Sequence, residues 1–422
     1  MVLSFNIKNL MTNKKNIEKI YIAWGILMNI VLLVFIYIST DKPVYDEAYF
    51  YENYKVLLEK GWSTDYIIHL KNQAPGPVFQ LFYYGLNKLN INVTIHLTRY
   101  FSLFFFNLGL WIFIKCFYKT GTSNFWISYF SLFSVSFIFP IIGMGLTETI
   151  SMVFLSSAIF FFTKFIDNRN FYQLLLFSVF YSIALVGRQN FLVIFPVFIF
   201  FVMNAKVEIK GRIISILICL LSLLPLLYFM NIWGGLVPPE QQWISGGSIL
   251  SLSAEHGLIG LGYYGILFFI VNPIFFINGL SKEVILITIV LSFIFQLIAK
   301  IKFLPFLSFF HKISFEPDIL YYIVPFLLTT TGLYFLSCLL LFTLKHINNR
   351  QILFLGLLNL FMALSPFKIL HQFSSRYIAQ SAYLVTGLTN QSESARFLQL
   401  RLFLLVAGSA AGLYSLHIYY NQ

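Results

Sequence analysis

The sequence predicts an all-α polytopic membrane protein, and three observations support that prediction. Hydrophobic residues make up 59% of the 422-residue chain, charged residues make up only 10%, and the mean hydropathy is +0.80. A soluble domain carries about 25% charged residues. The apolar residues gather in runs, several of them near the length of about twenty residues that crosses a bilayer as a helix. We therefore treat residues 1–422 as a single integral-membrane domain.

About thirteen apolar runs qualify as transmembrane helices, several of them short. The basic start of the chain leads into the first run without a small-residue cleavage site, so this run is expected to stay as an uncleaved span. The predicted spans lie near 20–39, 100–114, 125–142, 148–163, 171–187, 191–204, 213–230, 257–277, 284–299, 319–343, 352–366, 377–389 and 400–416.

The basic residues predict the orientation of these spans. With a cytoplasmic N-terminus, more than half of the 28 Lys and Arg residues fall in short cytoplasmic loops, as the positive-inside rule requires. The long loops 40–99, 231–256, 300–318 and 366–376 then lie outside. The expected location is a bacterial cytoplasmic membrane, or the endoplasmic reticulum membrane in a eukaryote, with chemistry on the outer or lumenal side. Membrane orientation explains the net charge of +12, so lipid rather than nucleic acid is the expected partner.

Several kinds of site lack support in the sequence. Neither a phosphate-binding loop nor a dinucleotide-binding glycine motif occurs, so a nucleotide site is not expected. The three cysteines show no Cys-x-x-Cys spacing. Glu255, His256, His69 and His96 show no metal-ligand spacing. We therefore expect no metal and no other cofactor.

The first outer loop, 40–99, contains the carboxylates best placed for chemistry. In a chain so poor in charge, ionisable groups near the membrane are functional candidates. An apolar pattern after Glu47 predicts helices lying at the membrane interface, and Pro75-Gly76-Pro77 returns the chain to the bilayer. The alternative is that the acids only keep a long loop solvated. The acids of this loop are Asp46, Glu47, Glu52, Glu59 and Asp65.

Two further charges interrupt apolar sequence. Glu148 lies at the outer end between the third and fourth predicted spans, and Arg188 lies at the outer end of the fifth. Ionisable groups at membrane depth are costly and usually have a partner and a function. The alternative is an ion pair that only orients the helices.

A basic group follows late in the chain, where Lys368, His371 and Arg376 lie within one outer loop. Arginine binds phosphate through a planar fork and lysine binds it as a point charge. The alternative is an interfacial belt of basic and aromatic residues.

The order and placement of these motifs resemble the C-type glycosyltransferase (GT-C) superfamily, membrane enzymes that use polyprenyl-phosphate sugars. Within it, the chain is most similar to the dolichyl-phosphate-glucose alpha-1,2-glucosyltransferases. The likeness covers about the first 200 residues and is thin beyond them. It rests on Tyr45-Asp46-Glu47, Trp62, Pro75-Gly76, Thr98-Arg99-Tyr100, Thr147-Glu148, Arg188-Gln189-Asn190 and Arg376-Tyr377.

The resemblance implies a GT-C-like fold and a hexosyltransferase whose acidic motif in the first outer loop supplies the catalytic base. The expected donor is a polyprenyl-phosphate-linked sugar, and the acceptor is a glycan or a lipid-linked acceptor. A single displacement inverts the anomeric configuration, with a carboxylate as base and cations facing the leaving phosphate. The expected catalytic residues are Asp46 as base, with Glu47 or Glu148 holding acceptor hydroxyls. The expected phosphate-binding residues are Arg188, Lys368, His371 and Arg376.

Two other functions fit an apolar, polytopic chain. A transporter or lipid-glycan flippase is the first, but two similar halves with broken helices at matching positions are not evident. A polysaccharide polymerase or ligase is the second, and the predicted outer loop 231–256 keeps that alternative open.

Overall fold

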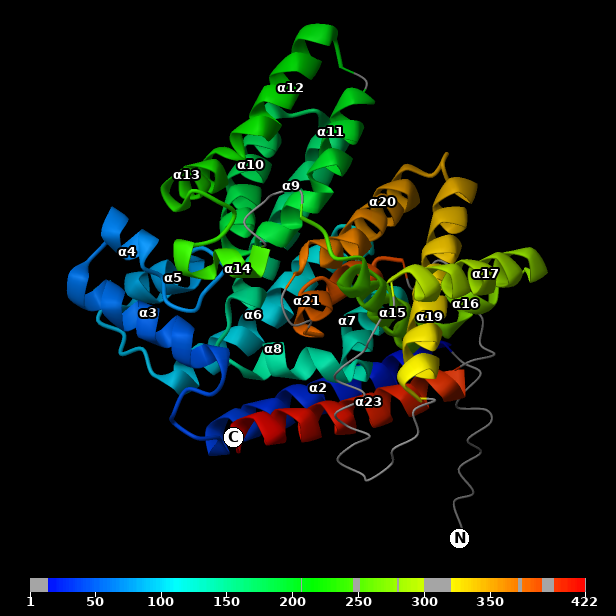
Figure 1. Cartoon of the computed structure of the whole chain (residues 1–422), viewed down its shortest axis with the longest axis horizontal. Coiled ribbons are helices and arrows are strands. Elements are labelled where there is room, and N and C mark those ends of the chain that lie inside the picture. Colours follow the sequence, from blue (N-terminus) through cyan, green and yellow to red (C-terminus); the bar gives the residue numbers. More distant parts are fainter. Residues whose placement is uncertain are drawn as a thin grey trace.

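The computed structural model describes residues 14–205, 207–245, 251–278, 281–299, 320–370, 374–388 and 398–421. Every regular element within these ranges is helical, as the sequence predicts (Figure 1). The elements up to residue 143 are α2 (Lys14–Ile38), α3 (Asp46–Lys60), α4 (Thr64–Ile68), α5 (Val78–Lys88), α6 (Ile95–Lys115), α7 (Ser123–Phe130), η1 (Ser131–Ser134), η2 (Ser136–Ile138) and α8 (Phe139–Gly143).

The remaining elements are also helices of widely different length. Those of the middle third are α9 (Thr147–Asn168), α10 (Phe171–Gly187), η3 (Gln189–Ile194), α11 (Phe195–Met203), α12 (Ile209–Leu221), α13 (Leu224–Trp233), η4 (Pro239–Gln241), α14 (Gln242–Ser245), α15 (Ala254–Val271) and α16 (Pro273–Asn278). Those of the last third are α17 (Lys282–Ala299), α19 (Leu320–Lys345), α20 (Arg350–Leu364), η5 (Ser365–Lys368), α21 (Arg376–Ala379), α22 (Ala382–Thr386) and α23 (Leu398–Tyr420).

The long apolar helices make this a multi-pass membrane protein. Among the described residues, eight helices are long and apolar enough to cross a bilayer, or nine if one bent pair counts as a span. The eight are Asn16–Ile38, Ile95–Lys115, Thr147–Asn168, Ile209–Trp233, Ala254–Val271, Phe326–Lys345, Arg350–Lys368 and Leu400–Tyr420.

The structure does not confirm the predicted count of about thirteen spans. The predicted span near 125–142 is a helix pair bent by 82°, and 377–389 holds two short helices. The segments 171–187 and 189–203 are helical but shorter than the eight. Hydropathy detects apolar runs, whereas a crossing also needs one helix of sufficient length. The predicted outer loop 300–318 lies outside the described residues.

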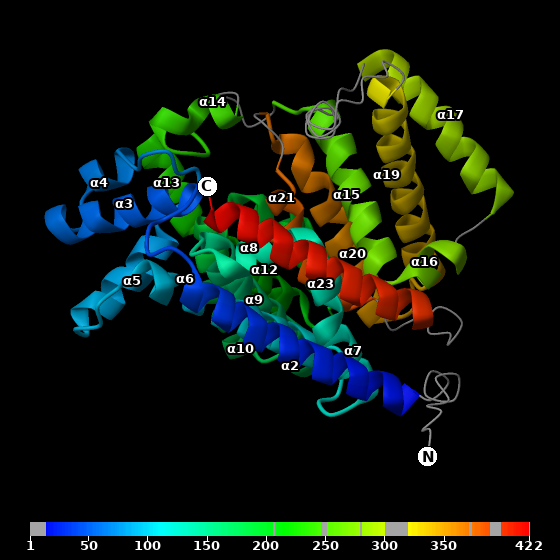
Figure 2. The same ribbon diagram turned by 90° about the horizontal axis from the view of Figure 1, so that it is seen from below.

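The first and last long helices pack against each other. The Trp24 indole of α2 donates to the Ser409 hydroxyl of α23 at 3.0 Å, and the helices lie side by side (Figures 1 and 2). At the C-terminal end of α23, the Tyr419 ring lies 4.8 Å from that of Tyr45, which follows α2 by a few residues. The two helices therefore run in the same direction.

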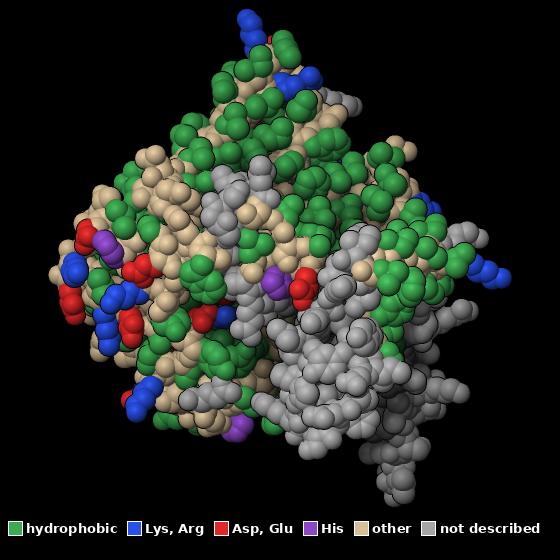
Figure 3. All heavy atoms as spheres, viewed as in Figure 1, with side chains coloured by type: hydrophobic (Ala, Val, Ile, Leu, Met, Phe, Trp, Pro, Cys, Tyr) green, Lys and Arg blue, Asp and Glu red, His purple; other side chains and the backbone are tan. Residues whose placement is uncertain are grey.

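Burial separates central from peripheral helices. The helix α9 packs between α6 and α10, and 67% of its apolar window is buried, against 22% for α23. On α12 the side chains of Ile213, Leu217 and Leu220 are about half exposed, as expected of a surface that contacts lipid. Figure 3 shows this apolar surface at the α12 end of the molecule.

The segment between α2 and α6 forms a separate polar end of the molecule. Its helices α3 and α5 pack together through buried rings, with Phe50 and Phe79 centroids 5.4 Å apart. The exposed side of this end carries acidic and basic side chains, which gather on one edge in Figure 3. Among them are Glu52, Lys55, Glu59, Lys60, Asp65 and Lys71. This segment carries the helices α3, α4 and α5, and it ends where Thr94 caps α6 through the amide of Leu97.

Candidate active site

The site begins at the first turn of α3, where Asp46 and Glu47 follow each other. Acidic side chains stabilise a helix N-terminus because they face its partial positive charge. Successive residues of a helix point about 100° apart. The two carboxylates therefore face different surroundings. The preceding residue, Tyr45, has φ +48° and ψ −131°, a conformation that a residue with a Cβ seldom adopts.

Glu47 is buried and fully bonded. Its Oε1 accepts from Arg99 Nε at 2.9 Å and from the Gly145 amide at 2.6 Å. Its Oε2 accepts from Arg99 Nη2 at 2.6 Å and from the Val44 amide at 2.9 Å. A carboxylate offers about four acceptor positions, so these bonds leave none for an acceptor hydroxyl. This geometry favours a structural role for Glu47.

Arg99, the partner of Glu47, connects three segments of the chain. Its guanidinium is completely buried and also donates to the Ser39 hydroxyl and the Thr40 carbonyl, at 2.7 and 2.6 Å. The Tyr420 ring of α23 covers it, with its centroid 4.6 Å from the guanidinium carbon. The pair formed by Glu47 and Arg99 therefore fixes the end of α2, the start of α3 and the start of α6 against one another.

Asp46 has a different partner and a different exposure. One carboxylate oxygen, Oδ2, accepts from Arg376 Nη2 at 2.6 Å, and the two side chains are 38% and 21% exposed. Burial by itself lowers the pKa of the Arg376 guanidinium, but the charges of Asp46 and Glu148 outweigh that effect and hold the pKa above its ordinary value. Arg376 is therefore a permanent cation beside a carboxylate that solvent reaches.

Glu148 and Arg188 form a second ion pair at the first turn of α9 and the end of α10. Glu148 is 2% exposed and Arg188 is 12% exposed. Among the described residues, Glu148 Oε2 and Arg188 Nε are buried without a hydrogen-bond partner. Buried polar atoms are nearly always hydrogen-bonded, so an unused acceptor and an unused donor at one place call for a functional explanation.

Tyr377 shows that the two pairs belong to one cluster. Burial raises the pKa of its hydroxyl above the ordinary value, and the charges of Arg376 and Arg188 lower it again. The carboxylates Asp46 and Glu148 raise it. All four charges are thus close enough to act on one phenol. The structure brings together four of the predicted residues around Tyr377, and we call this group of four charges the carboxylate–arginine cluster.

The turn that carries Arg188 is held by the loop before α5. The Gly76 amide donates to the Val186 carbonyl at 2.9 Å, and Gln189 Nε2 donates to the Ala74 carbonyl at 3.0 Å. A Cβ at Gly76 would lie 2.7 Å from that same carbonyl oxygen, so only glycine permits the approach. The Pro75-Gly76-Pro77 motif therefore positions Arg188.

The remaining predicted residues have other placements. Lys368 donates to the Ser251 carbonyl at 3.0 Å, which connects η5 to the segment before α15. His371 lies outside the described residues. Among the described residues, no group of three or more His, Cys, Asp or Glu side chains is placed to hold a metal ion. His96 and His256 each contact a backbone carbonyl, of Ser39 and Ile369.

Sequence reasoning did not identify the role of Arg99 or the aromatic residues around the cluster. The position of Arg99 in the first turn of a membrane helix was the available signal, because such a buried charge usually has a partner. Tyr419 had no such signal, since it lies at the end of an apolar helix among other aromatic residues. Only the contact with Tyr45 brings it to the site.

Comparison with known proteins identifies no relative: no family model, curated protein or solved structure matches the chain.

Proposed function

We propose that this protein is an integral-membrane glycosyltransferase that transfers a hexose from a polyprenyl-phosphate donor to a lipid-linked glycan or another extracytoplasmic acceptor. The observation that supports it most directly is the pairing of Asp46 with Arg376. A solvent-accessible carboxylate can accept the proton of an attacking hydroxyl. A guanidinium can bind the oxygens of a leaving phosphate through two hydrogen bonds.

The reaction is a single displacement at the anomeric carbon. The acceptor oxygen bonds to that carbon as its proton passes to the Asp46 carboxylate. The bond between the anomeric carbon and the phosphate oxygen breaks, and its electron pair leaves with the polyprenyl phosphate. Arg376 stabilises the negative charge that develops there, which is the role of preorganised cations in such transition states. Attack opposite to the leaving group inverts the configuration.

The ion pair also gives the reaction an order. Asp46 and the donor phosphate compete for the same guanidinium. When the phosphate engages Arg376, the Oδ2 atom of Asp46 loses its 2.6 Å contact and becomes available to the acceptor hydroxyl. Donor binding therefore prepares the base.

The second pair supplies the remaining contacts. Glu148 Oε2 accepts a sugar or acceptor hydroxyl, and Arg188 Nε donates to an oxygen of the donor; the protein leaves both atoms unbonded in the described structure. Glu47 acts as a positioning residue, because it fixes the first turn of α3 from which Asp46 projects.

One observation also favours transport. A buried ion pair beside a membrane helix, as Glu148 forms with Arg188, is a feature of transporters as well as enzymes. A lipid-glycan flippase would use such a pair to bind and release a charged headgroup. The two functions differ in outcome, since a transporter moves its substrate without breaking the glycosidic bond.

The test uses the full chain, reconstituted in liposomes with a lipid-linked glycan as acceptor and a panel of polyprenyl-phosphate hexoses labelled in the sugar. We expect label to pass to an extractable glycolipid with wild-type protein, and not with Asp46→Asn. Asp65→Asn is the matched control, because Asp65 lies in the same loop, is 70% exposed and pairs with the exposed His69. Translocation of intact donor without transfer, or full transfer by Asp46→Asn, would contradict the proposal.

A further inference from the structure

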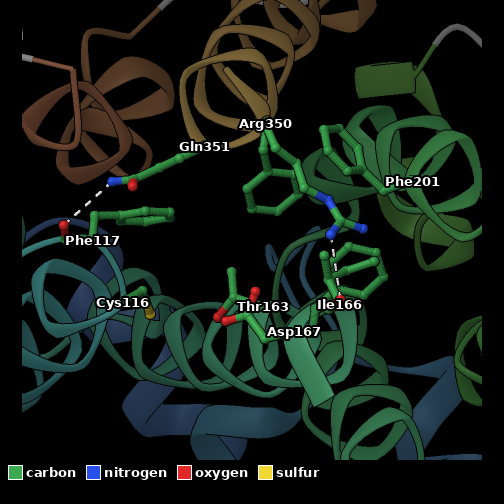
Figure 4. A pocket seen from close by; sticks show the side chains of 10 residues that line it. Cys116, Phe117, Thr163, Ile166, Asp167, Phe201, Arg350 and Gln351 are labelled. Carbon is green, nitrogen blue, oxygen red and sulfur yellow. Dashed lines mark hydrogen bonds between the residues drawn. The ribbon is translucent and has the colours of Figure 1, made fainter. Parts of the chain in front are cut away.

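A cavity lies far from the carboxylate–arginine cluster, between α6, α9, α11 and α20 (Figure 4). Its volume is about 170 Å³. An engineered protein cavity of about 150 Å³ is large enough to bind benzene. This cavity is therefore large enough to hold part of a small organic group.

The cavity lies at the opposite end of α9 from the active site. Glu148 is in the first turn of α9, and Asp167, which lines the cavity, is in the last. At 1.5 Å per residue the helix rises about 29 Å between them. The hydrocarbon core of a bilayer is about 30 Å thick. A helix that crosses the membrane thus places the cavity at the level of the other headgroup layer.

The cavity has an apolar floor and a polar rim. Phe162, Phe201 and Phe354 form the floor and are buried, with the Phe354 ring centroid 5.7 Å from Phe162 and 5.1 Å from Phe201. Arg350 and Asp167 stand on the rim and are exposed. Hydrocarbon fits the floor and a charged, hydrated group fits the rim, which is the arrangement that a phospholipid requires.

Among the described residues that line the cavity, Arg350 is the cation and Asp167 the anion, and the charge of Arg169 also acts on Arg350. Figure 4 shows Arg350 reaching from α20 and Asp167 from α9, on two sides of the cavity. Their charges interact through space, but among the described contacts no ion pair joins them. Arg350 makes one long hydrogen bond, from Nη1 to the Ile166 carbonyl at 3.4 Å. A guanidinium has five donor hydrogens, so most of its capacity remains.

Neither charge is placed to stabilise its own helix. Arg350 is the first residue of α20, where the helix end is partially positive, and Asp167 is in the last turn of α9, where it is partially negative. Arg350 therefore adds to the positive field at the start of α20, which attracts a negative group. Asp167 offers the α9 side one carboxylate as a direct partner for a cation, beside the exposed Lys164 and Arg169.

We propose that this cavity binds a phospholipid with a phosphoethanolamine headgroup. The phosphate accepts hydrogen bonds from Arg350, and the ammonium group donates to Asp167. The glycerol end of an acyl chain rests on the three phenylalanine rings. Basic pockets between membrane helices bind lipid headgroups, and the carboxylate on this rim selects a headgroup that also carries an amine.

The test is a competition between lipids, read by native mass spectrometry of the full chain released from detergent. The protein is incubated with equal amounts of phosphatidylethanolamine and phosphatidylglycerol of the same acyl chains, and the bound lipids are counted. We expect wild-type protein to retain phosphatidylethanolamine in preference. Arg350→Gln should lower retention of both lipids about tenfold, the effect of losing a charge-assisted hydrogen bond. Asp167→Asn should remove the preference and leave binding of phosphatidylglycerol.

Lys119→Gln is the matched control, because it removes an exposed positive charge from the α6–α7 connection without touching the cavity. It should behave as the wild type does. Unchanged retention by Arg350→Gln, or a wild-type preference for phosphatidylglycerol, would overturn the proposal. Soluble glycerophosphoethanolamine at the same concentration should not compete, and equal competition would show that the acyl chain is not recognised. Asp167→Asn changes only an exposed side chain, so its effect on the lipid preference tests the proposal even if Arg350→Gln fails to fold.

Discussion

Asp46 and Glu47 are adjacent in the sequence and identical in charge, yet they have opposite environments. Glu47 is 1% exposed, with four hydrogen bonds and a buried arginine. Asp46 is 38% exposed, with one hydrogen bond to an arginine that solvent also reaches. A saturated carboxylate cannot exchange partners without a large cost, whereas a half-exposed one can. The comparison supports the proposal that Glu47 has a structural role and that Asp46 takes part in the reaction.

The same contrast separates the arginines. Arg99 is enclosed by backbone carbonyls, a carboxylate and an aromatic ring, so a substrate has no access to it. Arg376 and Arg188 are partly exposed and belong to one cluster with Tyr377. The arginines thus share a charge but differ in exposure and in the number of donors still available, which favours Arg376 and Arg188 as the proposed substrate-binding residues.

The largest effect is expected from Asp46→Asn. Loss of a general base lowers transfer by about 100-fold to 10,000-fold. Its ion pair is partly exposed, so stability should change by only about 1 kcal/mol or less. Measuring transfer together with thermal unfolding in detergent separates the two effects. If Asp46→Asn lost stability to the same extent as transfer, Asp46 would have a structural role like that of Glu47.

Glu47→Gln should give the opposite pattern. Removing one partner of a buried ion pair costs about 3–5 kcal/mol, because the other charge stays buried without compensation. We expect a marked fall in the unfolding temperature, and transfer per folded molecule that is reduced less than in Asp46→Asn. The double variant Glu47→Gln, Arg99→Met should recover part of the stability, since no isolated charge remains. A stable Glu47→Gln protein without transfer would place Glu47 in the reaction itself.

Glu148→Gln and Arg188→Gln form a double-mutant cycle. Hydrogen bonds to charged groups contribute about 1.5–3 kcal/mol, so each single variant should lower kcat/KM by about tenfold to a hundredfold. The double variant should lose less than the sum, because the residues contact each other. If the pair only orients helices, stability falls while kcat/KM of the folded fraction stays at the wild-type value.

The smallest effect is expected from Lys368→Gln. Its hydrogen bond to the Ser251 carbonyl contributes about 1 kcal/mol to stability, and transfer should fall less than threefold. Arg376→Gln is the comparison, with a loss of at least tenfold because the cation beside Asp46 is removed. If Lys368→Gln lost as much transfer activity as Arg376→Gln, Lys368 would also be a phosphate-binding residue.

The sequence by itself determined the class of the molecule. Runs of apolar residues and a charged fraction of 10% require a helical membrane protein, because unpaired backbone groups are not tolerated in lipid. It also located the residues of the cluster, since Asp46, Glu148 and Arg188 are rare charges beside apolar runs. It did not give the number of crossings, because a hydropathy run near 125–142 does not show that the chain bends by 82°.

Only the tertiary structure decided which charges meet. Asp46 and Arg376 are 330 positions apart, and no local pattern connects them. The different surroundings of Asp46 and Glu47 depend on which way each side chain leaves the first turn of α3, with Arg99 on one side and Arg376 on the other. Hydropathy and helix propensity are properties of neighbouring residues. Ion pairing, burial and the number of unused donors are properties of the packed helices.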